Sequence, residues 1–104
     1  MPRVLTTPTA LAKPGCTISG RRLLPGGTPD CTPLEVTPGR PGVYQGATYG
    51  SDPIIIQPGA DGRFEMTLPP SAVLGVYKVQ VGAVTWNMVV PDAPSADFSD
   101  IAKL

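Results

Sequence analysis

Residues 75–90 form the pattern that most constrains the fold of this chain. Apolar and polar residues alternate on both sides of Gly82-Ala83, as they do on the two faces of a β-hairpin. Folding the segment about that dipeptide places Val81 opposite Val84, Val79 opposite Trp86, and Tyr77 opposite Met88. All six side chains share one face, so the hairpin predicts a sheet with one face in a core and the other in water.

The distribution of proline and glycine supports the same fold class. The 104 residues include 14 Pro and 12 Gly, spaced between short apolar runs and not massed in one block. An interior Pro costs a helix about 3 kcal/mol, so this spacing favours many short strands joined by turns. A chain of this length forms one domain, and its 41% of hydrophobic residues can build a core. We therefore expect an all-β fold, a small β-sandwich.

In the first half of the chain we expect three strands. The first covers residues 16–24, and the second covers 31–37 with an interruption at Pro33. Because Pro cannot donate to a ladder, the second strand lies at an edge or begins after Pro33. Residues 43–49 alternate as a third strand, although the pattern does not decide which of its faces is buried.

Two further strands are expected before the hairpin. Ile54–Ile56 are three β-branched residues in a row, which predicts a buried strand with apolar surface on both sides. Residues 63–68 alternate cleanly, with Phe64, Met66 and Leu68 predicted to point into the core.

Residues 1–15 are expected to form an extended arm, because they contain three Pro and no sustained alternation. The arm is either a frayed terminus or a segment that orders against a neighbouring subunit. In the second case its apolar residues Val4, Leu5 and Leu11 are the candidate subunit contacts.

Residues 95–104 are the one helix candidate. Ser95 or Asp97 could cap it, and a helix this short is marginal unless it docks. The candidate contacts of this tail are Phe98, Ile101 and Leu104. The expected organisation is therefore an arm at 1–15, a sandwich domain at 16–92, and a tail with a short helix at 93–104.

Charge and hydropathy argue against several partners. Eight basic and eight acidic residues give a net charge of zero, so no basic footprint for DNA or RNA exists. No apolar run approaches the roughly 18 residues that span a bilayer. The first residues lack the continuous apolar stretch of a signal peptide. We expect no nucleic acid and no membrane as partners, and a protein that is made in the cytoplasm and used or assembled there.

The residue types that usually carry catalysis are missing or scattered. The chain has no His, and most of its Asp residues lie in turn sequences, where Asp bonds its own backbone. Asp92, Asp97 and Asp100 are close in sequence, but their spacing matches no calcium loop of defined geometry. We expect no enzymatic activity, no metal and no cofactor.

Cys16 and Cys31 are the only cysteines. They could form a disulfide or contribute to a metal site, but two thiols without His rarely bind zinc. A strand pair that turns near Gly26-Gly27 would leave the two sulfurs several residues out of register, too far for a bridge. Two buried free thiols are the favoured interpretation.

Trp86 is the only Trp, and it shares its predicted face with Val84 and Met88. This favours a core anchor over an exposed stacking platform. The second interpretation stays open as a carbohydrate-binding surface that uses Tyr44, Tyr49 or Trp86.

Three segments in order resemble a known domain type. They are Thr17–Leu24 with 27–29 and 34–38, then Ala60–Pro69 with its Asp-Gly-Arg-Phe strand start, then Gly75-Val-Tyr-Lys-Val79. Together they resemble the carboxypeptidase-regulatory-like (transthyretin-like) β-sandwich domain. This resemblance implies a single seven-stranded antiparallel β-sandwich, of transthyretin-like or immunoglobulin-like type, without catalytic residues.

The ending, residues 86–92 followed by 97–101, is similar to versions of this domain in structural proteins of tailed bacteriophages. The similarity implies a non-enzymatic virion component, either a capsid decoration protein or a small tail, baseplate or fibre adaptor. Its partners would be other virion proteins in many symmetric copies, and homo-oligomers are also compatible. Its location would be the virion, assembled in the host cytoplasm. The alternative function is a β-sandwich module that binds carbohydrate or another ligand.

Overall fold

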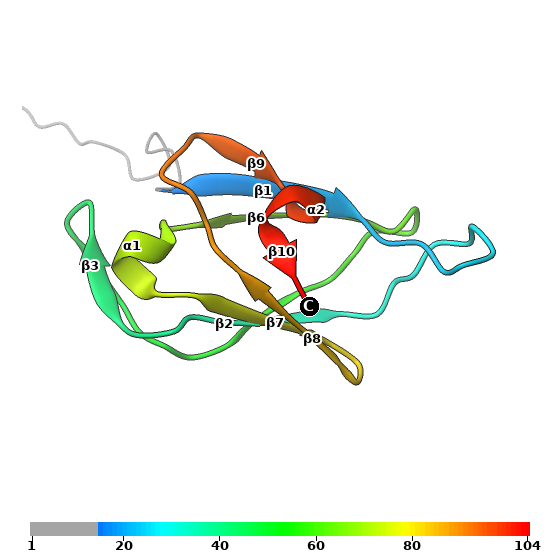
Figure 1. The fold of residues 1–104 in the computed structure, drawn as a ribbon, viewed down its shortest axis with the longest axis horizontal. Coiled ribbons are helices and arrows are strands. Elements are labelled where there is room, and N and C mark those ends of the chain that lie inside the picture. The colour runs from blue at the N-terminus through cyan, green and yellow to red at the C-terminus, as the bar shows by residue number, and fades with distance from the viewer. Residues whose placement is uncertain (1–14) are drawn as a thin grey trace, which may run out of the picture.

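The computed structural model describes residues 15–104, and it contains ten strands and two one-turn helices (Figure 1). In chain order the elements are β1 (Cys16–Arg21), β2 (Leu34–Thr37), β3 (Gly42–Tyr44), β4 (Ala47–Tyr49), β5 (Ile54–Ile56), β6 (Arg63–Leu68), α1 (Ser71–Leu74), β7 (Tyr77–Val81), β8 (Val84–Met88), β9 (Ser95–Asp97), α2 (Phe98–Ile101) and β10 (Ala102–Lys103). The expected all-β class is confirmed.

The strands form two facing layers and a separate hairpin. One sheet has the order β6-β1-β9, the other has the order β10-β8-β7-β2-β5, and β3 pairs only with β4. Figure 1 shows β1, β6 and β9 as one layer above β2, β7 and β8. The prediction of seven antiparallel strands is wrong in two respects: the described residues form ten strands, and β1 pairs with β9 in parallel.

The β7–β8 hairpin has the predicted register. Tyr77 pairs with Met88, Val79 with Trp86, and Val81 with Val84. Four of these six side chains are buried, Trp86 is half-buried, and Val84 is exposed. Val84 is exposed because it lies at the tip of the hairpin, beyond the reach of the opposite sheet.

The core lies between the two larger sheets. In the β1–β6 pair Ile18 lies opposite Met66. Phe64, Met66 and Leu68 are buried, as their alternation predicts. At one end of this layer the rings of Phe64 and Phe98 meet edge to face, with their centroids 5.3 Å apart. Such contacts between aromatic rings add to the gain from burying their area.

One polar group lies deep in this core. The hydroxyl of Tyr77 donates a 2.7 Å hydrogen bond to the carbonyl oxygen of Pro69. A buried hydroxyl needs such a partner, because leaving it unpaired costs about 1–3 kcal/mol. Burial, and to a smaller extent the neighbouring Tyr49, raise the pKa of Tyr77 far above its ordinary value. The bond links the start of β7 to the segment that follows β6.

Two expected strands have different bounds in the structure. β1 ends at Arg21 and not at Leu24, because the chain beyond it forms a loop that is closed by an isolated bridge between Leu23 and Pro29. β2 begins at Leu34, directly after Pro33, which was one of the two alternatives. It does not lie at an edge, since it pairs with β5 on one side and β7 on the other.

The single strand expected over residues 43–49 is a hairpin. β3 and β4 are joined by Gln45 and Gly46, whose φ angles are +48° and +79°. Positive φ at both central residues is the signature of the two-residue turn that joins antiparallel strands. Gln at the first of these positions hides the turn from sequence analysis, because Asn, Asp or Gly is usual there.

The strand of three isoleucines is not buried. β5 is the last strand of its sheet, and Ile54 and Ile55 are 43% and 61% exposed. The prediction of a strand with apolar surface covered on both sides is therefore wrong. The run of β-branched residues indicates a strand correctly, but it does not show how many neighbours that strand has.

The tail contributes to both sheets. β9 pairs with β1, and β10 pairs with β8, so residues 95–103 run from one layer to the other. The helix expected over 95–104 is reduced to the single turn of α2 between these strands. Asp97 caps this turn, since its side chain accepts from the backbone N–H of Ser99 at 3.1 Å.

Candidate functional site

Three aspartates have structural roles in turns. Asp30, Asp61 and Asp97 each accept a hydrogen bond from the backbone N–H two residues further on. For Asp30 and Asp61 this is the turn role expected of Asp in such sequences, and for Asp97 it is the expected helix cap. Within residues 15–104 no three His, Cys, Asp or Glu side chains come close enough to hold a metal ion.

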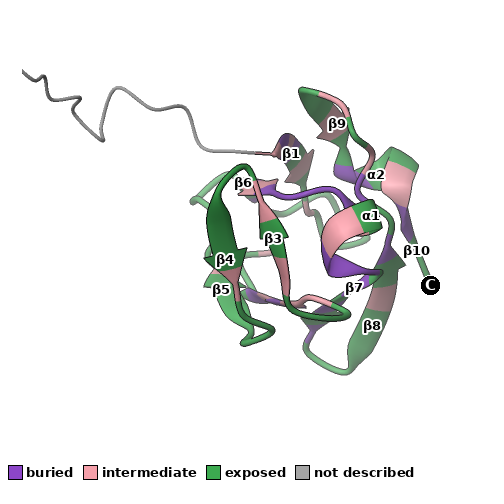
Figure 2. Ribbon diagram, turned by 90° about the vertical axis from the view of Figure 1, so that its left-hand side faces the viewer, coloured by how far each residue is buried: buried purple, intermediate pink, exposed green. Residues whose placement is uncertain are grey.

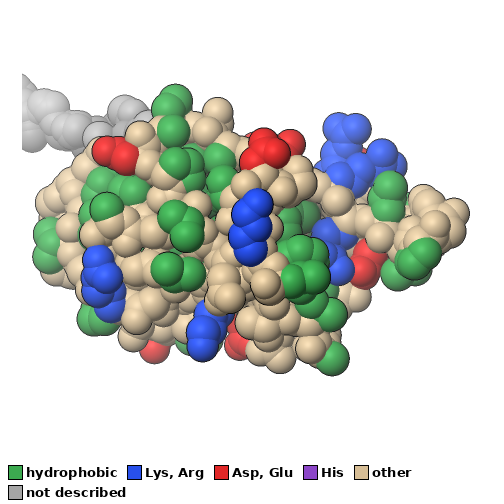
Figure 3. Space-filling model, viewed as in Figure 1, with side chains coloured by type: hydrophobic (Ala, Val, Ile, Leu, Met, Phe, Trp, Pro, Cys, Tyr) green, Lys and Arg blue, Asp and Glu red, His purple; other side chains and the backbone are tan. Residues whose placement is uncertain are grey.

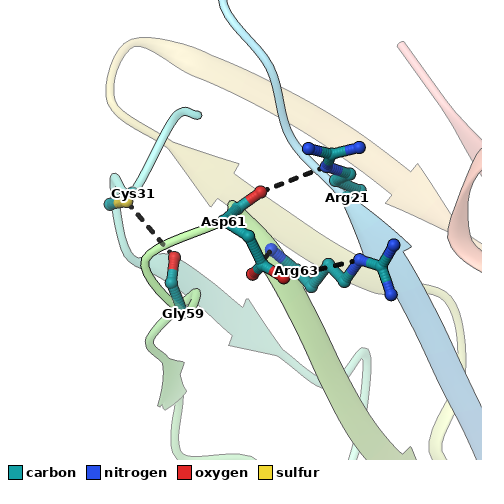
Figure 4. A network of polar contacts seen from close by, with 5 residues as sticks. All are labelled: Arg21, Cys31, Gly59, Asp61 and Arg63. Carbon is teal, nitrogen blue, oxygen red and sulfur yellow. Dashed lines mark hydrogen bonds and ion pairs between the residues drawn. The ribbon is translucent and has the colours of Figure 1, made fainter. Parts of the chain in front are cut away.

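Arginine side chains gather at the end of the β1–β6 pair. Arg21 and Arg63 are direct cross-strand partners, and Asp61 lies between them (Figure 4). Arg21 Nε donates to the carbonyl oxygen of Asp61 at 3.1 Å, and Arg63 Nε lies 3.5 Å from a carboxylate oxygen of the same residue. Because these groups are exposed, their ion pair contributes little to stability. The arrangement fastens the turn before β6 to β1.

A second ion pair closes the neighbouring loop. Arg22 lies 3.1 Å from Asp30, and both side chains are largely buried. Hydrogen bonds from Thr32, and then the Arg22 guanidinium, hold the pKa of Asp30 below its usual range. The pair holds the loop between β1 and β2 in place.

The two cysteines are free, but they differ in exposure. Cys16 is buried in the core, and burial raises the pKa of its thiol. Cys31 is exposed, and its thiol donates to the carbonyl oxygen of Gly59 at 3.3 Å (Figure 4). The absence of a bridge is as predicted, whereas the expected burial of both thiols is wrong, because Cys31 lies in a surface loop ahead of β2.

Thiol labelling checks this difference. With excess maleimide on the folded protein we expect one fast equivalent, at Cys31, and a second only after unfolding, because the Cys16 thiolate is disfavoured and shielded. Cys31→Ser should remove the fast equivalent and leave the slow one unchanged. Two fast equivalents in the folded protein would contradict the placement of Cys16.

The outermost strands of the two larger sheets are β6, β9, β10 and β5. Edge strands usually carry charges that discourage pairing with other chains. Three of these four follow that rule: β6 contains Arg63 and Glu65, β9 contains Asp97, and β10 contains Lys103. β5 has no charge, and it presents Ile54 and Ile55 to solvent. Figure 2 shows β5 coloured as exposed, on the side of the molecule where β3 and β4 lie.

Beside this strand a small apolar cleft opens between the two sheets. Its volume is about 180 Å³, and Ile54 lies at its rim. The other main lining residues are Val36, Tyr49, Leu68, Leu74 and Tyr77. Four of them, Val36, Leu68, Leu74 and Tyr77, belong to the core, so the cleft leads from the surface into the core. We call β5 together with this cleft the β5 edge surface.

Elsewhere on the described residues the hollows are larger and carry more polar groups; one of about 450 Å³ is lined by Ser19, Arg21, Arg63 and Asp97 among others. Figure 3 shows one face, on which apolar side chains are scattered and charged side chains stand apart without forming a single patch. Within the described range no helix is long and apolar enough to cross a bilayer.

The predicted subunit-contact residues differ in whether the structure describes them and in how exposed they are. Val4, Leu5 and Leu11 lie outside the described residues. In the tail, Phe98 is 7% exposed and Ile101 is partly buried against the core, whereas Leu104 is 78% exposed. The side chain of Phe98 is thus used within its own domain. Leu104 is the tail residue that a neighbouring subunit could reach.

The aromatic residues of the carbohydrate interpretation are also dispersed. Trp86 is half-buried, and its ring meets that of Phe98 edge to face at 5.9 Å, in keeping with a core anchor. Tyr44 and Tyr49 both belong to the β3–β4 hairpin, where Tyr49 lines the cleft beside β5, whereas Trp86 lies in β8. The three rings therefore do not form one platform.

Sequence analysis missed the β5 edge surface, although a signal was available. Pro53 and Pro58 bracket the three isoleucines. Because Pro cannot donate within a ladder, such bracketing is typical of a short edge strand. Neither a model of a known protein family nor a curated protein matches this chain.

Proposed function

We propose that this chain is a non-enzymatic structural protein of a tailed-phage virion, which binds neighbouring subunits as a capsid decoration protein or as a small tail, baseplate or fibre adaptor. The observation that carries the binding role is the β5 edge surface, an uncharged outer strand with Ile54 and Ile55 in solvent. An extended segment of another subunit can add to such an edge and gain main-chain hydrogen bonds.

The charge balance supports close packing of this kind. The net charge of zero removes the self-repulsion that keeps many proteins apart. The exposed isoleucines beside an apolar cleft also offer area whose burial stabilises a contact.

The virion context rests on the sequence resemblance. Two of the segments that resemble the transthyretin-like domain form β6 and β7, the strands that supply Phe64, Met66 and Tyr77 to the core. The third segment supplies β1 and β2. The phage similarity itself lies in residues 86–92 and 97–101, which include the end of β8 and the helix α2.

Co-sedimentation with tailed-phage particles and with their empty shells tests the proposal. We expect the purified protein to pellet with one of the two in a saturable way. Ile55→Lys should weaken this binding, whereas Val89→Lys should not, because Val89 is similarly exposed, at 57%, and lies away from β5. Particles that never retain the protein would refute the virion role.

A second candidate function is carbohydrate binding, which one observation favours. Trp86 lines an open hollow of about 400 Å³ together with Arg21, Arg22 and Ser99. Tryptophan fluorescence separates the two candidates. A core anchor should give blue-shifted emission that resists quenching, whereas red-shifted emission that a soluble oligosaccharide protects from iodide would favour the sugar site.

A further inference from the structure

The β5 edge surface is suited to one short strand. Among residues 15–104, β5 pairs on one side only, with β2. Pro53 and Pro58 limit the length of any ladder that can form on its open side. A partner segment would therefore be about as short as β5 itself, free of charge along its centre, and rich in residues that favour strands.

The N-terminal arm contains such a segment. Val4-Leu5-Thr6-Thr7 combines β-branched and apolar residues without charge, and Pro2 and Pro8 bracket it as Pro53 and Pro58 bracket β5. Arg3 precedes it, and Asp52 is among the residues that line the cleft. In a parallel alignment of the two segments these opposite charges would lie at the same end of the ladder.

The cleft matches an aliphatic side chain in size and character. An apolar cavity of about 150 Å³ can hold a molecule as large as benzene. The cleft has a volume of about 180 Å³ and is lined mostly by apolar groups. A leucine side chain fits that space, and the arm offers Leu5 and Leu11.

The described chain begins near the β5 edge surface. Gly15 lies against the carbonyl group of Leu68, and Leu68 and Ile54 line the same cleft. β1 and β5 therefore both start at this end of the sandwich. The 14 residues before Gly15 can span about 46 Å when extended, which is enough to reach another copy.

We propose that residues 3–7 of one copy add as a strand to β5 of a second copy, with a leucine of the arm in the cleft. This inference rests on the proposed function, because it names the partner of the β5 edge surface. The contact is heterologous, since an arm meets an edge, and repetition of it builds rings or open chains of subunits.

Sedimentation velocity of the full chain over a concentration series tests the inference. We expect wild type to form dimers and larger species as its concentration rises. Leu5→Lys places a charge in the arm, and Ile55→Lys places a charge on the β5 edge. Each variant alone should stay monomeric, because its dissociation constant for self-association should rise by about tenfold or more. An equimolar mixture should form dimers and nothing larger, because only one intact arm and one intact edge can meet.

The matched controls are Thr9→Lys in the arm and Val89→Lys on the domain, which add the same charge outside the proposed contact and should associate as wild type does. A wild type that stays monomeric, variants that associate as well as wild type, or a mixture that stays monomeric would each overturn the inference. Pairing of the arm with β5 of its own copy would give the first of these results.

A peptide measurement keeps the test valid if Ile55→Lys disturbs folding. A fluorescein-labelled peptide of residues 1–14 should bind the full-length Leu5→Lys protein, whose edge is intact, and its anisotropy should rise. The same peptide with Leu5→Lys should not bind. Absence of binding by the unmodified peptide would also overturn the inference. If the protein binds phage particles but never self-associates, only the proposal of arm-to-β5 pairing is refuted. If it self-associates but does not bind phage particles, only the virion role is refuted.

Discussion

Ile18→Ala is expected to lower the free energy of unfolding by about 2–5 kcal/mol. Ile18 is fully buried at the centre of β1, the middle strand of its sheet, and it lies opposite Met66. Removing three carbons there loses the free energy gained by transferring them from water into the core. It also leaves a cavity that cannot close, because β1 is held in place by strands on both sides. The free energy of unfolding of a whole domain is about 5–15 kcal/mol, so the loss is a large share of its stability.

Urea unfolding followed by circular dichroism measures this loss, and Ile55→Ala is the matched control. The chemical change is the same, but Ile55 is 61% exposed on an edge strand. We expect its loss to stay within about 0.5 kcal/mol, as for most surface substitutions. Equal losses at the two positions would mean that β5 is covered or that β1 is not central.

Gly62→Ala should lower the free energy of unfolding by a similar amount, about 2–4 kcal/mol. Gly62 has a φ of +82°, which a residue with a Cβ adopts only with strain. A Cβ at this position would also meet the backbone oxygen of Arg22 at 2.3 Å. The main chain would have to move, and the 2.8 Å hydrogen bond from the Arg22 amide to the Gly62 oxygen would weaken.

Gly26→Ala provides the comparison for this variant. Gly26 lies in the loop between β1 and β2, its φ is not positive, and nothing approaches the position of its Cβ within 4 Å. We expect the midpoint of urea unfolding to change little for Gly26→Ala and to fall clearly for Gly62→Ala. A Gly62→Ala protein as stable as wild type would contradict the tight turn before β6.

Local patterns predicted the parts of the fold that are set by near neighbours. The register of β7 and β8 follows from a two-residue turn and strict alternation, and both are visible in residues 75–90. The inward side of β6 follows from the same period of two. These features need no knowledge of the rest of the chain.

Features that depend on distant partners were not predictable in this way. Three isoleucines indicate a strand, but whether one or two strands flank it depends on residues 34–37, which pair with β5 on one side and β7 on the other. The parallel pairing of β1 with β9 joins residues far apart in the sequence, and Ser95-Ala96-Asp97 has no strand signal of its own. The exposure of the β5 edge surface is likewise a property of the finished sheet, and its one local signal is the pair Pro53 and Pro58 that flanks the isoleucines.

The way residues 95–103 link the layers has a consequence for how the protein is made. Residues 95–103 supply one strand to each sheet, and the aromatic ring of Phe98 is buried between the two sheets. Pairing across such a long separation in sequence is slow to form. During translation the two sheets therefore cannot be completed until residue 103 has left the ribosome, and until then chaperones that attend nascent chains can reach the apolar interior between them.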